Sequence, residues 1–382
     1  MNTFQLHPAI HFGPNALDRL KEIKARRVFV VADPFVVKSG AISLVTDRLS
    51  AASIPSTVFA EVVPDPPIET VAAGVKALLA TDADTIVAIG GGSAIDTAKL
   101  IREFGTQMAP NSTRPRLIAI PTTSGTGSEA TSFAIVTDTA SRTKVSLVSD
   151  SLLPEEGILD VDLVKTVPPP LVADTGLDVL THALEALVSI HHTDFTDALA
   201  AKAVELIGAY LLRSYLDAND LRARAKMHHA SCLAGMAFNA ANLGLNHGIA
   251  HTLGAHFHIP HGRANAIVLP HVIAYNSGVG DRSCGHVEST HALRAYVDAA
   301  RRLGLQASND ATAVRALIQW VRFMQAEMNV PASVSATGKC SESDFRAVVP
   351  EMVDAALKDR CTEGNPRPPT AEDVTRIINA LW

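Results

Sequence analysis

Six of the chain's 15 histidines fall between residues 247 and 271. Imidazole is the commonest metal-binding side chain and changes charge near neutral pH, so this density indicates metal binding or proton transfer. His247 and His251 are four residues apart, which on a helix places both side chains on one face. Any one of these histidines alone is more often an ordinary core or surface residue, but six together favour a chemical role.

A second pair with the same spacing lies upstream, at Asp178 and His182. A helix would present this carboxylate and imidazole on one face, where both can reach the same ion. His261 directly follows Ile259-Pro260 and precedes Gly262, and these neighbours predict that it arrives from a loop. Together with the histidine-rich stretch, the pair predicts a metal and proton-transfer site.

Length and composition limit the classes of protein to consider. At 382 residues the chain exceeds the usual size of a single core, so two domains are expected. Its 47% hydrophobic and 19% charged residues are typical of a soluble globular protein. A net charge of −6 argues against nucleic-acid binding, and we find neither a membrane-spanning stretch nor a signal peptide. The cysteines form no CxxC pair, which favours a reducing cytoplasm; they are Cys232, Cys284, Cys340 and Cys361.

The first half of the chain alternates between two kinds of segment. Apolar, β-branched runs predict strands at 26–33, 56–62, 85–93 and 116–121. Amphipathic patterns predict helices at 39–53, 68–81 and 93–104. This alternation predicts an α/β domain with a mainly parallel sheet and helices on both faces.

The pattern changes after the run Pro168-Pro169-Pro170, beyond which only helices are predicted. Ser343 beside Asp344, and Thr370 with Asp373 three residues later, are helix-start signals. We therefore expect an α/β domain over 1–175 and an all-helical domain over 176–382. The expected helices are 171–190, 194–216, 221–241, 243–256, 263–276, 290–303, 310–328, 343–359 and 370–381.

Two loops at predicted strand ends could hold a nucleotide. Residues 90–93 read Gly-Gly-Gly-Ser, a turn whose backbone amides can bind phosphate. Ser93 could be the N-cap of the following helix, with Asp96 as its partner three residues later. The Thr/Ser/Gly loop at 121–126 follows the next strand, and loops at such strand ends bind ligands in open sheets. Asp33 could accept hydrogen bonds from a ribose and would repel a 2′-phosphate, favouring NAD. It precedes the glycines, unlike the acid of the usual fingerprint, so a plain tight turn remains an alternative.

These segments, in this order, resemble the iron-containing (group III) alcohol dehydrogenases across nearly the full length of the chain. Within that family the chain looks most like the propanol- and ethanol-utilisation enzymes, through DVLTHALEALVS and KMHHASCLAGMAF. The motifs shared with the family are FGPNAL, VPDPP, GGGSAIDTAK, PTTSGTGSEAT, TGLDVLTHALEALVS, GLNHGIAHTLGAHFHIPHGRANAIVLPH and CTEGNPRP.

The resemblance implies the dehydroquinate synthase-like fold: a Rossmann-like, dinucleotide-binding N-terminal domain and a helical metal-binding domain. It implies that His251 is the catalytic, proton-handling histidine near the nicotinamide. The implied ligands of Fe²⁺, with Zn²⁺ or another divalent ion as alternatives, are Asp178, His182, His247 and His261. The implied NAD(H) contacts are Asp33, Gly91, Gly92, Ser93, Thr122, Thr123, Thr126, Thr131 and Lys144.

The resemblance also places Asp65, Phe133 and Cys361 in the substrate pocket, where the Phe133 ring would favour a plain aliphatic substrate. It implies interconversion of short-chain aldehydes and primary alcohols, such as propanal and 1-propanol, by hydride transfer with metal polarisation of the carbonyl. A cytoplasmic homodimer or larger homo-oligomer is expected, with a bacterial microcompartment as a further possibility. His258 and His271 are interpreted as structural or supporting groups, and His256 is left unassigned.

Three alternatives remain open. One is a reductase of a charged small aldehyde or oxo acid, of the sulfoacetaldehyde or maleylacetate kind. Another is a lyase of the dehydroquinate synthase type, which needs a cluster of basic residues, whereas the metal region offers Arg263 and few other cations. The third is a non-catalytic metal-binding protein.

Overall fold

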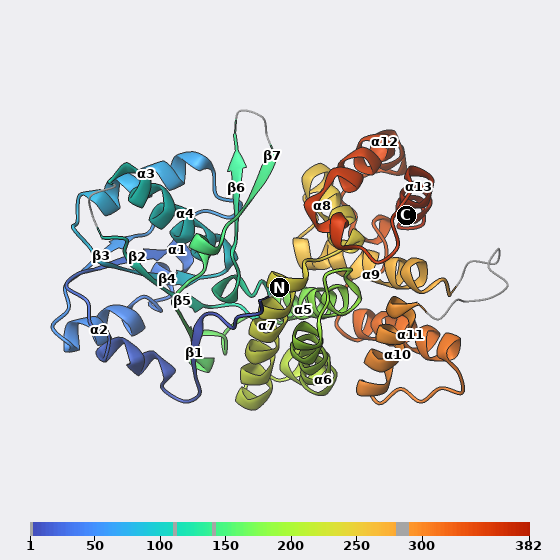
Figure 1. Cartoon of the computed structure of the whole chain (residues 1–382), viewed down its shortest axis with the longest axis horizontal. Helices are drawn as coiled ribbons and strands as arrows, with labels where there is room; N and C mark the ends of the chain where they lie inside the picture. The colour runs from blue at the N-terminus through green and yellow to red at the C-terminus, as the bar shows by residue number, and fades with distance from the viewer. Residues whose placement is uncertain (1–2, 110–112, 140–142, 280–289) are drawn as a thin grey trace. The chain divides into compact units, whose positions relative to one another are not determined.

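The computed structural model describes the chain except for residues 1–2, 110–112, 140–142 and 280–289. The chain divides into two compact units, Met1–Thr166 and Val167–Trp382 (Figure 1). The expected boundary after residue 175 falls inside the first helix of the second unit, α5 (Pro169–Val188). Pro168 is the N-cap of this helix, and Pro169 and Pro170 lie in its first turn, where proline is well tolerated.

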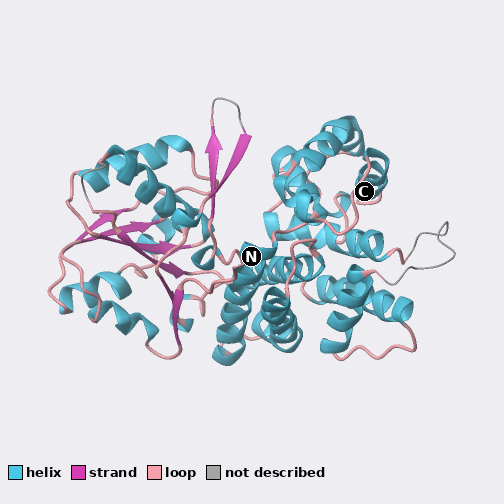
Figure 2. Ribbon diagram, viewed as in Figure 1, coloured by secondary structure: helices cyan, strands magenta, loops and turns pink. Residues whose placement is uncertain are grey.

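The first unit contains a six-stranded parallel sheet of order β1-β8-β5-β4-β2-β3, shown by the magenta arrows in Figure 2. The predicted strands correspond to β2, β3, β4 and β5. The bounds of the six are β1 Ala9–Phe12, β2 Val28–Ala32, β3 Ser56–Phe59, β4 Thr85–Gly90, β5 Arg116–Pro121 and β8 Glu156–Leu159.

Helices cover both faces of this sheet, as predicted. Alternate residues of the central strands enter two separate cores: Val31 and Ile86 face one, whereas Val30 and Val87 face the other. The first core includes residues of α3 and α4, and the second includes residues of α2. The helix bounds are α1 Pro34–Lys38, α2 Ser43–Ala51, α3 Ile68–Leu79 and α4 Gly92–Met108.

Four strands were not predicted. β1 and β8 have four residues each, too few for a periodic pattern. The other two form an antiparallel hairpin, β6 (Phe133–Asp138) with β7 (Thr143–Val148).

A fully buried lysine joins this hairpin to α4. The Lys99 ammonium donates hydrogen bonds to the Phe133 carbonyl oxygen (2.6 Å), to Ser128 Oγ (3.1 Å) and to Thr131 Oγ1 (3.2 Å). Burial lowers the Lys99 pKa to about 8, an effect that the nearby Asp96 carboxylate opposes. The prediction that Asp96 pairs with Ser93 as a helix cap was wrong. Asp96 instead accepts hydrogen bonds from Ser128 Oγ and the Ile135 amide, while α4 begins after Gly91 without a side-chain cap.

We predict that Lys99→Ala destabilises the protein by about 3 kcal/mol, because it leaves buried acceptors and a carboxylate without their cation. Chemical denaturation measures the loss. The matched control is Lys76→Ala, an exposed lysine of α3 whose replacement should change stability by less than about 0.5 kcal/mol. Equal effects of the two substitutions would contradict the structural role of Lys99.

The described part of the second unit is helical, as predicted, and no helix there or in the first unit is long and apolar enough to cross a membrane. Thr370 and Asp373 form the predicted capping box, but α12 is capped by Ser341 rather than Ser343. The bounds are α5 Pro169–Val188, α6 Asp194–Leu216, α7 Leu221–Ala241, α8 Leu245–Phe257, α9 His261–Ser277, α10 His291–Arg302, α11 Asp310–Glu327, α12 Glu342–Lys358 and α13 Ala371–Asn379.

Helix α5 is the centre of this unit. Almost all of its residues from Val172 to Val188 are buried, and it packs against α6, α7, α9 and α10. A helix that is enclosed on nearly every side can hold polar groups only where neighbouring helices supply partners for them. The polar residues of α5 therefore mark the place to look for a site.

Candidate functional site

The structure brings together the four side chains predicted as metal ligands. Asp178 and His182 come from α5, His247 from α8, and His261 is the first residue of α9. One potential ligand atom from each residue lies within 4.8 Å of the others. Three of the side chains are buried, whereas that of His261 is 43% exposed. The prediction that His261 arrives from a loop was wrong, because Pro260 is the N-cap of α9 and His261 begins the helix.

Two glycines allow the helices to approach closely enough for this arrangement. A Cβ atom at Gly262 would lie 2.1 Å from the backbone oxygen of Asp174, so α9 can begin against α5 only with glycine there. A Cβ atom at Gly244 would lie 2.8 Å from Glu185, just before α8 begins. These contacts fix His261 and His247 beside the polar face of α5.

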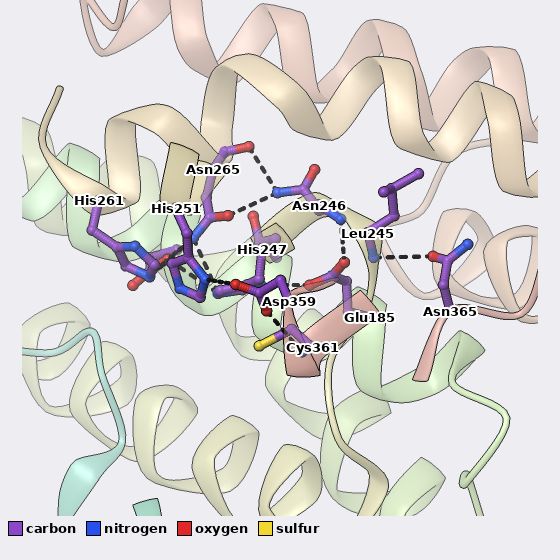
Figure 3. A network of polar contacts seen from close by, with 12 residues as sticks. Glu185, Leu245, Asn246, His247, His251, His261, Asn265, Asp359, Cys361 and Asn365 are labelled. Carbon is purple, nitrogen blue, oxygen red and sulfur yellow. Dashed lines mark hydrogen bonds and ion pairs between the residues drawn. The ribbon is translucent and has the colours of Figure 1, made fainter. Parts of the chain in front are cut away.

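Asn265 lies between three of the four side chains. Its side-chain nitrogen is 2.7 Å from Asp178 Oδ1, 3.0 Å from His247 Nε2 and 3.2 Å from His261 Nε2 (Figure 3). Three acceptor atoms thus converge on one donor, as they would on a cation. The sequence reading missed Asn265, although its position one helical turn after His261 placed it on the same face.

His247 is held by a buried carboxylate that the sequence reading also missed. Its Nδ1 lies 2.5 Å from Glu185 Oε2, which leaves Nε2 for the centre of the site. Burial lowers the pKa of His247 well below its usual value and keeps the ring neutral. Burial also raises the Glu185 pKa to about 8, although backbone amides, including that of Asn246 at 2.7 Å, favour the ionised form.

His251 lies next to this group and has its own carboxylate. Its ring centroid is 5.4 Å from that of His261 and 5.9 Å from that of His247. Its Nδ1 is 2.7 Å from Asp359 Oδ2. Burial raises the pKa of Asp359, but hydrogen bonds and charge from His251 outweigh it and leave that pKa below its usual value. Asp359 is 108 residues from His251 along the chain, and no local pattern in the sequence connects them.

The chemistry of the four donors fits a divalent metal ion. Neutral imidazoles and a carboxylate are ligands for Fe²⁺ and Zn²⁺, and their types alone do not distinguish these ions. The Glu185 carboxylate orients His247 as carboxylates orient metal-binding histidines in general. Burial raises the pKa of Asp178, a cost that a bound cation would offset.

The residues predicted to bind the nucleotide lie in the first unit, and most of them converge on two adjoining loops. The Thr122 amide donates to the Gly90 carbonyl oxygen (3.0 Å), and a Cβ atom at Gly92 would lie 2.9 Å from Thr126. Asp33 lies beside them, since a Cβ atom at Gly90 would be 3.0 Å from its Oδ2. Its other oxygen, Oδ1, caps α1 by accepting from the Val36 amide, a role that the sequence reading missed. Gly91 and Thr123 belong to the same two loops, and Ser93 lies in the first turn of α4.

The remaining predicted residues are more dispersed. Thr131 is only 2% exposed and accepts a hydrogen bond from Lys99, so its hydroxyl is less available than the loop hydroxyls. Lys144 belongs to β7, opposite Thr137 of β6. Asp65 lies in the loop before α3 with a left-handed backbone, and Phe133 begins β6. Cys361 belongs to the second unit and lies two residues after Asp359.

Among the described residues, three histidines of the 247–271 stretch do not belong to the clustered donors: His256, His258 and His271. His258 ends α8 in a left-handed conformation. Burial lowers the pKa of His271.

Known sequence families match both units. The iron-containing alcohol dehydrogenase pattern matches residues 8–161, and the C-terminal pattern of the same family matches residues 172–382. The chain belongs to the iron-containing alcohol dehydrogenases. This assignment makes it an oxidoreductase of alcohols and aldehydes and shows the expected fold.

Individual relatives agree with the family. The dehydrogenase is 42% identical to 1-propanol dehydrogenase PduQ of Salmonella typhimurium, with all of both chains covered. It is 35% identical to the NADPH-dependent butanol dehydrogenase of Clostridium saccharobutylicum, covering 100% of this chain and 98% of that one. A solved structure of 1,3-propanediol oxidoreductase is 31% identical, with a TM-score of 0.88 and both chains fully covered.

The pairing of Arg263 bears on the alternatives that involve a charged substrate. Arg263, the cation nearest to them in sequence, pairs with Asp174 through two nitrogen–oxygen contacts of 3.1 and 3.2 Å. A paired guanidinium offers less to a carboxylate or sulfonate. The alternatives that need a basic cluster, the lyase among them, are therefore not better supported than alcohol and aldehyde chemistry.

We predict that metal affinity rises about fivefold from pH 7 to 8 and then levels off. Binding through His247 Nε2 needs the Nδ1 proton to face an ionised Glu185, whose pKa in the metal-free protein is about 8. Below that pH the ion must displace a proton, and above it no proton is lost.

Competition with a chelator at several pH values measures this slope. In Glu185→Gln the side chain can still accept from Nδ1 but cannot ionise, so the slope between pH 7 and 8 should disappear. An unchanged slope in that variant would assign the proton to another group.

Proposed function

We propose that the protein is an NAD(H)-dependent enzyme that interconverts short-chain aldehydes and primary alcohols, propanal and 1-propanol being representative. The observation that carries the proposal is the convergence of Asp178, His247 and His261 on one point, with His251 beside it. His182 is the fourth ligand proposed. Fe²⁺ is the ion proposed, since the family is iron-containing, and Zn²⁺ suits the same donors.

The reaction needs a polarised carbonyl, a hydride and a proton. A divalent ion at the four donors would supply Lewis-acid polarisation, and a nicotinamide would supply or accept the hydride. His251 handles the proton. Its Nδ1 bonds to Asp359, which fixes the tautomer and leaves Nε2 to exchange a proton with the alcohol oxygen. The ionised Asp359 stabilises the imidazolium form that donates during aldehyde reduction.

The nucleotide is proposed to bind the first unit. Gly91, Gly92 and Ser93, at the start of α4, are suited to a pyrophosphate because free backbone amides and the helix dipole point toward it. Asp33 is proposed to accept from the adenosine ribose. The other contacts proposed are Thr122, Thr123, Thr126, Thr131 and Lys144.

Substrate preference is proposed to follow from Phe133, Asp65 and Cys361. The Phe133 ring offers no hydrogen-bond donor for a second hydroxyl, which favours plain aliphatic aldehydes. A homodimer or larger homo-oligomer in the cytoplasm completes the proposal, with a microcompartment as a possible site of action. The absence of disulfides among the three described cysteines is compatible with a reducing environment.

The proposal is tested by following NADH consumption with ethanal, propanal and butanal, using metal-free protein and protein loaded with Fe²⁺ or Zn²⁺. We expect turnover only with metal, and a loss of about a hundredfold or more without it. His247→Ala should lose both metal and activity, whereas His256→Ala, in the same helix but outside the donor group, should retain them. Equal rates with and without metal would overturn the metal's role.

A second prediction concerns the choice between NADH and NADPH. Asp33→Gly removes the charge that would repel a 2′-phosphate, so the NADPH/NADH ratio of kcat/KM should rise by about tenfold or more. Asp33→Asn also removes the charge but keeps an N-cap for α1, and it should shift the ratio in the same direction. If neither variant shifts the ratio, Asp33 does not contact the ribose.

A further inference from the structure

A second group of possible metal ligands adjoins the first. One nitrogen of His251, one carboxylate oxygen of Asp359 and the sulfur of Cys361 lie within 4.8 Å of one another. Figure 3 shows Asp359 and Cys361 beside each other, with the Asp359 carboxylate turned toward His251. Unlike three of the four proposed iron ligands, all three of these residues are partly exposed, so an ion could reach them from solvent.

The backbone fixes two of these donors in place. Asp359 is the N-cap of the 3₁₀ turn Arg360–Gly364, and its Oδ1 accepts from the Cys361 amide at 2.8 Å. Its other oxygen, Oδ2, is left to contact His251 at 2.7 Å. Gly248 lets this turn pack against α8, since a Cβ atom there would lie 2.2 Å from Thr362 Oγ1. The nitrogen, oxygen and sulfur are therefore held together before any ion arrives.

The local charge also favours a cation. Burial raises the pKa of the Cys361 thiol well above its usual value, and the negative charge of Asp359 raises it further. The same charge attracts a cation, and a bound ion deprotonates a coordinating thiol. The exchange is balanced: metal–sulfur and metal–nitrogen bonds form, the sulfur–hydrogen bond and the Nδ1–hydrogen bond of His251 break, the thiol proton leaves to solvent, and the imidazole takes up its proton at Nε2 instead.

We propose that His251, Asp359 and Cys361 form a second divalent-metal site, suited to Zn²⁺, that is separate from the four-donor site. Zn²⁺ accepts sulfur, nitrogen and oxygen ligands together, and three protein ligands with an open fourth position are usual for it. An ion at this site occupies His251 Nδ1 and displaces it from Asp359, so excess zinc inhibits the enzyme. Inhibition rests on the proposed function, whereas binding does not.

Cobalt titration tests the site directly. Co²⁺ replaces Zn²⁺ readily, and a cobalt–thiolate bond gives an intense charge-transfer absorption in the near ultraviolet. The four-donor site contains no sulfur, so its cobalt complex gives no such band. We expect the band to grow as a second equivalent of Co²⁺ binds to the wild-type protein. It should be absent in Cys361→Ser and present in Cys340→Ser, which alters another partly buried cysteine.

The proposal is overturned if the wild-type protein shows no band at saturating Co²⁺, or if the band persists in Cys361→Ser. If Cys361→Ser fails to fold, Asp359→Asn provides the test. It should weaken binding of the second equivalent of Co²⁺ at least tenfold, and an unchanged affinity would overturn the proposal. Zinc should inhibit the iron-loaded enzyme at concentrations that fill the second site. A cobalt band in a protein without aldehyde turnover would uphold the second site and refute the proposed function. Aldehyde turnover by a protein that gives no cobalt band would support the proposed function and refute the second site.

Discussion

The contact between the start of α9 and the backbone of α5 is the constraint on which the candidate site depends. Gly262 meets the Asp174 backbone at a distance that excludes any side chain. This approach places His261 and Asn265 opposite Asp178, on a helix that is otherwise enclosed by apolar neighbours. A larger residue at position 262 would separate the helices, and the four donors could not share one centre.

In the proposed mechanism, two histidine–carboxylate pairs divide the chemistry between them. His247 and Glu185 are both buried, and burial favours their neutral forms in the absence of an ion. His251 and Asp359 are partly exposed, and Asp359 stays ionised. The difference in burial makes the first pair suitable for holding a metal and the second for exchanging protons. The same exposure leaves Asp359 and Cys361 open to a second ion.

Local patterns predicted the strands β2 to β5 and the long helices, but they missed β1, β8 and the hairpin of β6 and β7. The buried strands β2, β4 and β5 and the helices of the second unit were all recognised, because their hydrophobic periods extend over enough residues. The strands β1 and β8 have four residues each and depend on distant partners: β1 pairs with β8, 147 residues away at Ala9 and Glu156, and β8 also pairs with β5.

The sequence by itself determined the two-part architecture and the family, and it indicated the four candidate ligands, because recurring spacings and motifs carry that information along the chain. Only the tertiary structure decided which groups surround them. Asn265, Glu185 and Asp359 act through contacts between helices, and Lys99 through contacts with a distant hairpin. The physical reason is that a hydrogen bond or a pKa depends on distance and burial in space, which a linear pattern does not specify.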